Sequence, residues 1–458
     1  MSETFDSIVI GAGQAGPAMA ARLAASGERV ALIERDQMGG TCVNTGCTPT
    51  KTLVASAHAA WLALEGARYG VLTGPVTVDA ARVRARKDAV VLAARGNVTR
   101  WMENTAGITV IRGHARFTGP HTVAVDDRQL QAARIFVNVG ARATVPPVPG
   151  METVAYLTNA DVMDLDVVPD HLVILGGSYI GLEFAQIFRR FGAAVTVLES
   201  APKFLAREDA DIAAQIHGIL TGEGIRIEVG ISDLSFAKPD HGITARFRTD
   251  AGGNVELTAS YLLVATGRRP NTDDLGLDAA GLTTDPRGAI PVDETCRTAQ
   301  PHIWVLGEAN GRGAFTHTAY NDFEIVAGNL LDGEDRKISD RKPVYALFID
   351  PPLGRIGMSE AEARAAGHRV LVGTRAMARV SRAVEVGETR GMMKIIFDAE
   401  TRRLLGAAII GFHGDEAVQF LLPALYQGLT DHDIRAMTGI HPTVTELLPY
   451  AIADAKEV

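Results

Sequence analysis

The length of 458 residues predicts two to four domains rather than one. Hydrophobic residues make up 47% and charged residues 22%, so every domain can bury a full core and extended disorder is excluded. The formal charge of −9, with no stripe of Lys and Arg between aromatic residues, argues against a nucleic-acid partner. At the N-terminus, MSETFDSIVIG has no basic start and runs directly into a strand, and no apolar run reaches the length of a membrane span. We therefore expect a cytoplasmic protein without a membrane partner.

Two segments repeat one pattern of strand, glycine-rich turn and helix. Residues 5–10 predict a β-branched strand, which is followed by GAGQAG (11–16), an Ala-rich helix and a second strand that ends at Glu34. A short apolar strand precedes GGSYIG (176–181), and a helix and a strand ending at Glu199 follow it. The first glycine stands 23 residues before the acid in both segments. Two βαβ units with the same internal spacing predict two dinucleotide-binding domains in tandem.

Between and after these repeats, composition marks the boundaries of the other segments. A helical stretch at about 51–104 and short strands lead to VPPVPG (145–150), a rigid linker. A strand-and-turn pattern at 261–267 ends the second repeat, and another at 303–308 lies in a third segment. A charged stretch at 332–342 precedes a proline and marks another boundary. The last segment alternates strands and helices without a phosphate loop, so we expect a separate module.

The residues of each repeat suit a dinucleotide. A pyrophosphate needs bare amides at a helix N-terminus, and glycine lets the backbone approach it. Glu34 can accept hydrogen bonds from a ribose diol. In the second repeat Ser178 replaces the middle glycine, and Glu199 would repel a 2′-phosphate, which favours NADH over NADPH. Lys203 and Arg207 lie close enough in sequence to offset that repulsion.

Cys42 and Cys47 lie in GGTCVNTGCTPTK (39–51). Residues five apart on a regular helix have Cα atoms roughly 8–9 Å apart, whereas a disulfide needs about 7 Å or less. A bridge therefore requires a distorted first turn, which Gly46 can supply, and a strained bond at a helix N-terminus is readily reduced. No second cysteine or histidine pair completes a zinc site, and inert buried thiols would leave the glycines and threonines unexplained. The pattern favours a redox pair, with Cys296 as a structural residue and no metal site.

These motifs together resemble the class I pyridine nucleotide–disulfide oxidoreductases, a family that includes glutathione reductase, dihydrolipoyl dehydrogenase and mercuric reductase. The resemblance covers essentially the whole chain and is nearest to the mercuric-reductase-like branch. Besides GAGQAG and the cysteine motif, it is carried by GHA (113–115), NVGAR (138–142), GGSYIGLEFA (176–185), ATGRRPN (265–271) and IHPTVTE (440–446).

The resemblance implies an acid–base and thiol machinery. Cys42 matches the interchange thiol that attacks the substrate, and Cys47 matches the charge-transfer thiol that lies over the flavin. His441 and Glu446 match the acid–base pair that each subunit of a homodimer contributes to its partner. A histidine oriented by a carboxylate suits a dithiol that must lose and regain protons near neutral pH.

The resemblance also implies FAD and a pyridine nucleotide as cofactors. Lys51 and Glu183 match an ion pair beside flavin N5, and Tyr179 matches an aromatic gate that nicotinamide displaces. The residues implied in cofactor binding are Gly11, Gly13, Gly16, Glu34, Gly40, Thr41, Lys51, Ala115, Gly140, Glu308, Gly176, Gly177, Tyr179, Ile180, Gly181, Glu199 and Gly267.

The expected fold is α/β, with two tandem Rossmann-like domains and a C-terminal α+β dimerisation domain. The expected divisions are an FAD-binding domain (1–150), an NAD(P)-binding domain (151–270), a central domain completing the FAD site (271–340) and a dimerisation domain (341–458).

The sequence departs from the family pattern at three places. Glu308 stands where an aspartate usually contacts the flavin side chain, and Asn138 replaces a common threonine. The C-terminal LLPYAIADAKEV lacks the cysteine pair with which mercuric reductases receive the metal.

The expected function is electron transfer from NAD(P)H through FAD and the Cys42–Cys47 disulfide to a small-molecule disulfide, dithiol or soft metal ion. One alternative is a dihydrolipoyl-type dehydrogenase that runs in the opposite direction. A second alternative is a flavin-bound redox sensor without turnover.

Overall fold

Seven strands form the sheet of the first repeat in the computed structural model, which describes residues 2–458. Its parallel strands are, in order across the sheet, β3 (Ile108–Arg112), β2 (Val30–Glu34), β1 (Glu3–Ile10) and β6 (Arg128–Val137). The antiparallel strands β5 (Thr122–Val125) and β4 (Ala115–Gly119) extend it, and β16 (Ile303–Val305) pairs in parallel with β6. The third segment of the chain therefore returns to the first sheet.

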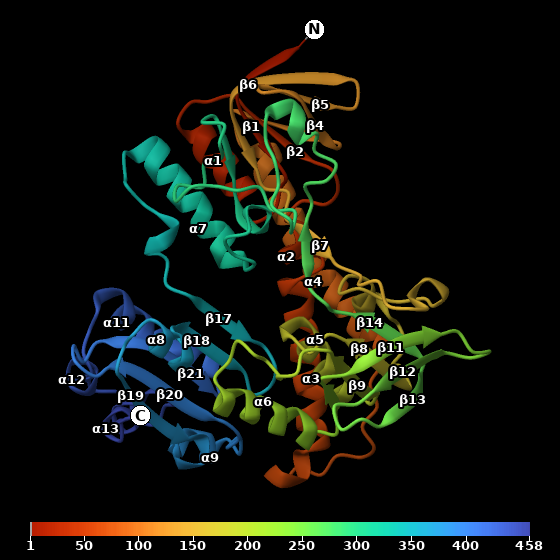
Figure 1. Cartoon of the computed structure of the whole chain (residues 1–458), viewed down its shortest axis with the longest axis vertical. Helices are drawn as coiled ribbons and strands as arrows, with labels where there is room; N and C mark the ends of the chain where they lie inside the picture. The colour runs from red at the N-terminus through yellow and green to blue at the C-terminus, as the bar shows by residue number, and fades with distance from the viewer. Residues whose placement is uncertain (1) are drawn as a thin grey trace.

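Both faces of this sheet are covered, as a mainly parallel sheet requires. Ile8, Val9 and Ile10 of β1 are each at most 4% exposed, although successive side chains on a strand point to opposite faces. Val9 packs in a core with α1 (Gly16–Ala25) and α7 (Thr316–Ala327), while Ile8 and Ile10 share the other core with β4 and β5. Figure 1 shows α1 and α7 together on one side of these strands.

Two long helices of the first unit, inserted between β2 and β3, extend to the second unit. α3 (Cys47–Leu64) follows the short α2 (Gly40–Asn44), and α4 (Ala80–Asn104) begins where the Asp79 carboxylate accepts a hydrogen bond from the Arg82 amide at 3.0 Å. Figure 1 shows α2, α3 and α4 extending from the first sheet down beside α5 (Tyr179–Phe191). Leu53 and Ala57 of α3 belong to the core of the second unit. The helix that begins at Cys47 is thus anchored in the core of the second unit by residues that follow Cys47 along the chain.

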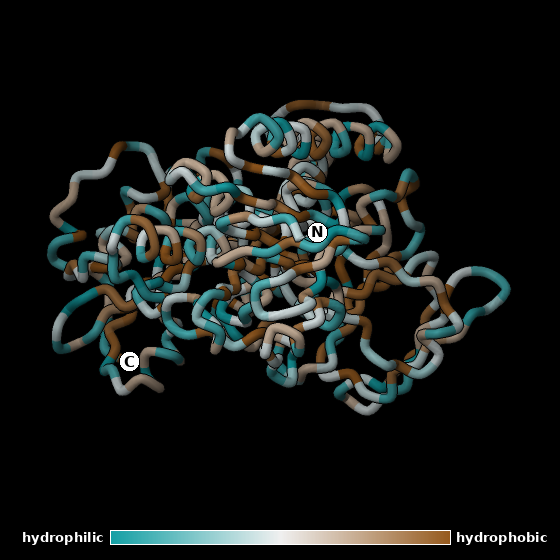
Figure 2. Tube along the Cα trace, turned by 90° about the horizontal axis from the view of Figure 1, so that it is seen from above, coloured by the Kyte–Doolittle hydropathy of each residue, from teal (hydrophilic) through white to brown (hydrophobic). Residues whose placement is uncertain are grey.

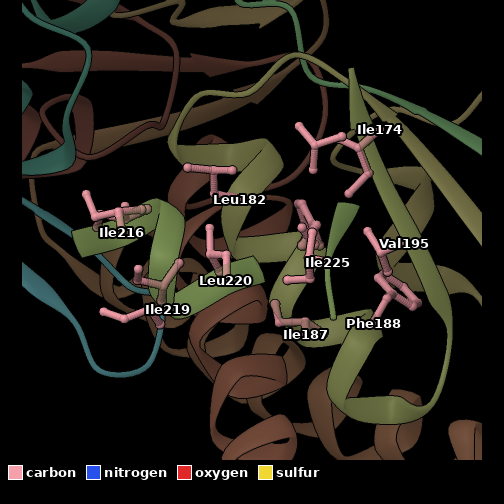
Figure 3. Close-up of a cluster of buried hydrophobic side chains, with 14 of the residues drawn as sticks. Ile174, Leu182, Ile187, Phe188, Val195, Ile216, Ile219, Leu220 and Ile225 are labelled. Atoms are coloured by element: carbon pink, nitrogen blue, oxygen red, sulfur yellow. The ribbon is translucent and has the colours of Figure 1, made fainter. Parts of the chain in front are cut away.

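The second unit repeats the first in a smaller form. Its parallel sheet has the order β10 (Arg226–Val229), β9 (Ala194–Glu199), β8 (His171–Leu175) and β14 (Tyr261–Val264). An antiparallel sheet of β11 (Ser232–Ala237), β12 (Ile243–Arg248) and β13 (Asn254–Ala259) lies beside it. Figure 3 shows Leu182 and Ile187 of α5 in one buried cluster with Ile216, Ile219 and Leu220 of α6 (Ala210–Gly222). The tandem arrangement predicted from the spacing of the two glycine motifs is confirmed.

The C-terminal domain is α+β, as predicted. Its antiparallel sheet has the order β17 (Val344–Leu347), β18 (Leu353–Gly357), β21 (Leu404–Ile410), β20 (Met392–Asp398), β19 (Val370–Ala376) and β22 (Lys456–Glu457). Its helices are α8 (Glu360–Ala365), α9 (Ser381–Glu385), α10 (Gly414–Ala417), α11 (Leu422–Gln427), α12 (Asp431–Arg435) and α13 (Leu448–Ala453). Figure 2 shows hydrophilic segments on many outer loops and hydrophobic segments concentrated toward the middle. Within residues 2–458, no helix combines the length and the apolar character that a bilayer crossing needs.

A buried ion-pair network fixes the C-terminal domain against the second unit and α3. Arg190 of α5 and Glu223 form an ion pair of 2.8 Å in which both side chains are 2% exposed. Arg190 also pairs with Asp350 of the C-terminal domain and lies 4.7 Å from the ring centre of Trp61 on α3. Removing one partner of such a buried pair costs roughly 3–5 kcal/mol. The network therefore holds α3, α5 and the C-terminal domain together.

Candidate functional site

A cavity of about 910 Å³ lies where the first unit, the second unit and the C-terminal domain meet. This volume is at the upper end of the range for sites that take large cofactors and drug-sized ligands. Of the residues predicted from the sequence, the cavity is lined by Gly11, Gly13, Glu34, Gly40, Thr41, Cys42, Cys47, Lys51, Ala115, Gly140, Tyr179, Ile180, Glu183 and Glu308. The remaining predicted residues, Gly16, Gly176, Gly177, Gly181, Glu199, Gly267, His441 and Glu446, lie outside its lining.

The first glycine motif forms a tight turn between β1 and α1. Gly11 has φ +101°, and a Cβ atom there would lie 2.3 Å from the Asn138 carbonyl oxygen. A Cβ atom on Gly16 would lie 2.0 Å from the Gly11 carbonyl oxygen. The Asn138 side chain accepts a hydrogen bond from the Gly16 amide at 2.9 Å and donates one to Leu306 at 3.0 Å. Asn138, which replaces the threonine common in the family, thus links the glycine turn to the end of β16 by hydrogen bonds.

The two acidic residues hold the two glycine turns in the same way. Glu34 accepts hydrogen bonds from the amides of Ala12 at 2.7 Å and Asp36 at 2.8 Å. Glu199 accepts them from the amides of Gly177 and Ala201, both at 2.8 Å. A carboxylate has about four acceptor positions, so each acid retains positions for ribose hydroxyls. The bare turn, the helix N-terminus and the anchored acid beside a large cavity fit the adenosine diphosphate part of FAD.

The helix breaks between the two cysteines. α2 ends at Asn44 and α3 begins at Cys47. A Cβ atom on Gly46 would lie 2.8 Å from the Thr41 carbonyl oxygen and 3.3 Å from Cys42 Cα, so only glycine fits in this break. The distortion that the spacing of the cysteines requires is present. Both cysteines are free thiols that hydrogen-bond to each other, and the Cys47 sulfur lies 3.2 Å from the Thr316 hydroxyl.

The two thiols differ in acidity. The pKa of Cys47 is lowered to about 6, because the hydrogen bond from Cys42, the Thr316 hydroxyl and the positive charge of Lys51 together outweigh the opposing effects of burial and of Glu183. The same hydrogen bond to Cys47, together with burial, raises the pKa of Cys42 far above its ordinary value. Near neutral pH the reduced pair therefore consists of a Cys47 thiolate and a Cys42 thiol.

Replacing Thr316 with Val should raise the pKa of Cys47, because a hydrogen bond to the thiolate stabilises the charged form. The midpoint for alkylation of Cys47 by iodoacetamide in the reduced protein, near pH 6 in the wild type, should move up by about one pH unit. Mass spectrometry of the Cys47 peptide across a pH series measures this midpoint. Thr316→Ser keeps the hydroxyl and should keep the wild-type midpoint; equal midpoints for Val and Ser would contradict the role of Thr316.

Lys51 and Glu183 form an ion pair of 2.7 Å beside the cysteines. Lys51 stands four residues after Cys47 on α3 and so lies on the same helix face. The Glu183 side chain is only 7% exposed and accepts a second hydrogen bond from the Phe348 amide at 3.0 Å. The Lys51 nitrogen also lies 4.5 Å from the centre of the Phe348 ring. The charge of Lys51 is therefore held in one place within the cavity.

Arg268 forms an ion pair with Glu308 at the cavity. Its Nε lies 2.9 and 3.0 Å from the two Glu308 carboxylate oxygens. Arg268 opens β15 (Arg268–Pro270), which pairs with β7 (Ala141–Ala143), and it also donates to the Ala141 carbonyl oxygen. Burial raises the pKa of Glu308. The Glu308 carboxylate is thus paired with a cation that is itself fixed to the backbone of β7, a partner that the sequence pattern does not indicate.

His441 and Glu446 are paired, but away from the cavity of their own chain. Both Glu446 carboxylate oxygens lie 3.0 Å from His441 Nδ1. The His441 side chain is 72% exposed and neighbouring Ile440 is 79% exposed, whereas the Glu446 side chain is 15% exposed. One chain alone does not bring His441 to Cys42.

The family model described as pyridine nucleotide-disulphide oxidoreductase matches residues 5–322, and that of the dimerisation domain of the same family matches residues 344–452. The chain belongs to the pyridine nucleotide–disulphide oxidoreductases. It is therefore a flavoprotein oxidoreductase that uses FAD and a pyridine nucleotide and acts on a disulfide or a metal ion.

Individual relatives align over nearly the whole chain. RclA of Escherichia coli K12, described as a probable pyridine nucleotide-disulfide oxidoreductase, is 35% identical over 97% of this chain and 98% of its own. A mercuric reductase of Streptomyces lividans is 33% identical over 98% and 95%. A dihydrolipoyl dehydrogenase of Chlorobaculum parvum is 33% identical over 97% and 96%. The solved Cu(II) complex of the HOCl-induced flavoprotein disulfide reductase RclA from Escherichia coli superposes with a TM-score of 0.90 at 34% identity, covering 99% of each chain.

Proposed function

We propose that this protein reduces a small-molecule disulfide with electrons from NADH, and that Cys42 and Cys47 are the thiols that carry out the exchange. The observation that supports this most strongly is the division of acidity within the pair. Cys47 is a thiolate near neutral pH, while Cys42 keeps its proton inside the cavity. A dithiol that attacks and then closes on itself needs two sulfurs with different tasks.

The division of the chain follows from this proposal. Residues 1–150 and 271–340 together bind FAD, residues 151–270 bind the pyridine nucleotide, and residues 341–458 form the dimer. The chemistry that FAD supplies when bound is to accept a hydride from the reduced nicotinamide and to pass the electron pair to a disulfide. We assign FAD binding to Gly11, Gly13, Gly16, Glu34, Gly40, Thr41, Lys51, Ala115, Gly140 and Glu308, and pyridine nucleotide binding to Gly176, Gly177, Tyr179, Ile180, Gly181, Glu199 and Gly267.

The thiol steps balance with the residues at hand. Cys42 loses its proton, and its sulfur attacks the substrate disulfide, which forms a mixed disulfide and releases one thiolate. The Cys47 thiolate then attacks the Cys42 sulfur, which closes the Cys42–Cys47 disulfide and releases the second thiolate. Because the pKa of Cys42 is raised, the first step needs a base, and the departing thiolates need an acid.

His441 of the partner subunit is the group that we assign to these proton transfers in a homodimer. Three observations support the assignment: the Glu446 carboxylate orients its imidazole, its side chain is exposed, and it lies outside the cavity of its own chain. The presence of a dimerisation domain at residues 344–452 supports the same arrangement. Lys51 and Glu183 then hold a fixed charge beside the cofactor, Cys47 faces the cofactor and Cys42 faces the substrate.

The preference for NADH rests on Glu199. Its carboxylate is anchored by two backbone amides, so it cannot easily turn away from a 2′-phosphate. Such a phosphate would bring negative charge against a fixed carboxylate.

Anaerobic titration of the yellow holoprotein tests the proposal. One equivalent of NADH per subunit should release two thiols that react with a chromogenic disulfide after the nucleotide is removed. A long-wavelength absorbance band should appear as the Cys47 thiolate forms against the cofactor. NADPH should give the same end point only at higher concentration. Consumption of NADH without any gain in thiols would contradict the disulfide relay and favour a flavin-bound sensor.

A soft metal ion is the second candidate acceptor. Thiolate sulfur is a ligand that such ions prefer, and the structure of the E. coli RclA relative was solved as a Cu(II) complex. We rank disulfides first, because the thiol steps above need no residue beyond Cys42, Cys47 and the partner's His441. Steady-state assays with disulfides, Cu(II) and Hg(II), and the reverse assay with dihydrolipoamide and NAD⁺, separate the candidate acceptors.

A further inference from the structure

One buried carboxylate joins the second unit to the C-terminal domain at the wall of the cavity. The Glu208 side chain is fully buried. Its Oε1 accepts hydrogen bonds from the hydroxyls of Tyr179 and Tyr345, the latter at 2.8 Å. Its Oε2 accepts one from Arg355 at 2.8 Å, and the Arg355 side chain is 2% exposed. The partners of the Glu208 carboxylate are thus side chains from α5, β17 and β18.

The cluster has one member that belongs to the dinucleotide motif. Tyr179 is the first residue of α5, directly after the second glycine turn, and its ring lines the cavity. Tyr345 lies on β17 and Arg355 on β18, both in the C-terminal domain. The Tyr179 and Tyr345 rings lie 5.6 Å apart, and Tyr345 stacks on Phe315 at 5.8 Å. Burial raises the pKa of Tyr179 far above its ordinary value, so its hydroxyl remains a donor.

We infer that Glu208, fixed by Arg355, is a latch that holds the Tyr179 ring in its resting position and thereby sets the affinity for the nicotinamide. The inference deepens the proposed function, because it rests on the role of Tyr179 as the residue that nicotinamide displaces. Glu208 is a positioning residue, since it acts only through Tyr179.

The effect on binding follows from the balance between two positions of the ring. We take nicotinamide to bind only when Tyr179 has moved. The apparent dissociation constant then equals the intrinsic constant divided by the fraction of protein molecules in which the ring has moved. A hydrogen bond to a charged, buried acceptor favours the resting position more than a bond to water would. Removing the Tyr179 hydroxyl should therefore strengthen binding, whereas the loss of a purely structural contact would weaken it or leave it unchanged.

Tyr179→Phe tests the latch, with Tyr345→Phe as its matched control. Both variants keep the ring and remove one hydroxyl from the same Glu208 oxygen, but only the first frees the residue that moves. Calorimetric titration of the oxidised holoprotein with NAD⁺ should show roughly tenfold tighter binding for Tyr179→Phe. The KM for NADH should fall as well. Tyr345→Phe should bind no more tightly than the wild type.

Two further variants separate the possible failures. The double variant E208Q/R355M removes both charges of the buried pair and should tighten NAD⁺ binding in the same direction as Tyr179→Phe. Tyr179→Ala removes the ring itself and should also change NAD⁺ binding. If Tyr179→Ala changes binding and Tyr179→Phe does not, or if Tyr345→Phe tightens binding equally, the latch is refuted. If Tyr179→Ala leaves binding unchanged, the proposed role of Tyr179 at the nicotinamide site is refuted instead.

Discussion

A Cys47→Ser variant should form a mixed disulfide with its substrate and fail to release it. Cys42 can still attack a disulfide, but no second sulfur is present to resolve the adduct, so turnover should stop after one bond exchange. Loss of a covalent nucleophile can cost on the order of 10⁶ in turnover, and we expect disulfide reduction to fall to background. Intact-mass spectrometry of the reduced variant after addition of glutathione disulfide should show one bound glutathionyl group per subunit.

Cys42→Ser should abolish turnover without trapping an adduct, because the proposed function assigns the attack on the substrate to Cys42 and only the closing step to Cys47. Cys296→Ala serves as the control: Cys296 is fully buried and lies outside the cavity lining, so this change should leave turnover intact. Adduct formation by Cys42→Ser and not by Cys47→Ser would reverse the roles assigned to the two sulfurs.

The parts of the site that the sequence predicts are those set by local spacing. The turn at Gly11 and the acid at Glu34 occur within one βαβ unit, whose geometry is repeated at Gly176 and Glu199. The break at Gly46 follows from the distance that two cysteines five residues apart must cover. In each case the residues that set the local geometry and the residues that it positions lie in one short stretch of chain, so their spacing alone predicts the arrangement.

The parts that the sequence does not predict are contacts between distant segments. The Cys47 sulfur meets Thr316, which lies 269 residues away, and Glu208 meets Arg355 across 147 residues. Arg268 stands in a motif that was noted for its glycine, yet its pairing with Glu308 depends on how β15 lies against β7. No periodicity or spacing encodes such pairs, because the packing of whole domains decides which side chains meet.

His441 occupies an intermediate position between these cases. Its pairing with Glu446 is local, and the family resemblance indicates it from the sequence. Its approach to Cys42 depends on a second chain, because the loop that carries it is exposed and lies outside the cavity of its own chain. A mixed dimer therefore tests whether His441 acts on the Cys42 of the partner subunit.

His441→Gln should lower the turnover of the homodimer by roughly 10²–10⁴-fold, the usual contribution of a general acid–base group. A dimer built from one Cys42→Ser subunit and one His441→Gln subunit should nevertheless recover about half of the wild-type turnover. If each site takes Cys42 from one subunit and His441 from the other, this dimer has one site with both defects and one site with none. If both residues acted within one subunit, each site would carry one defect and the mixed dimer would be as inactive as its parents. Purifying the mixed dimer through two different affinity tags and comparing its turnover with both parents distinguishes the two arrangements.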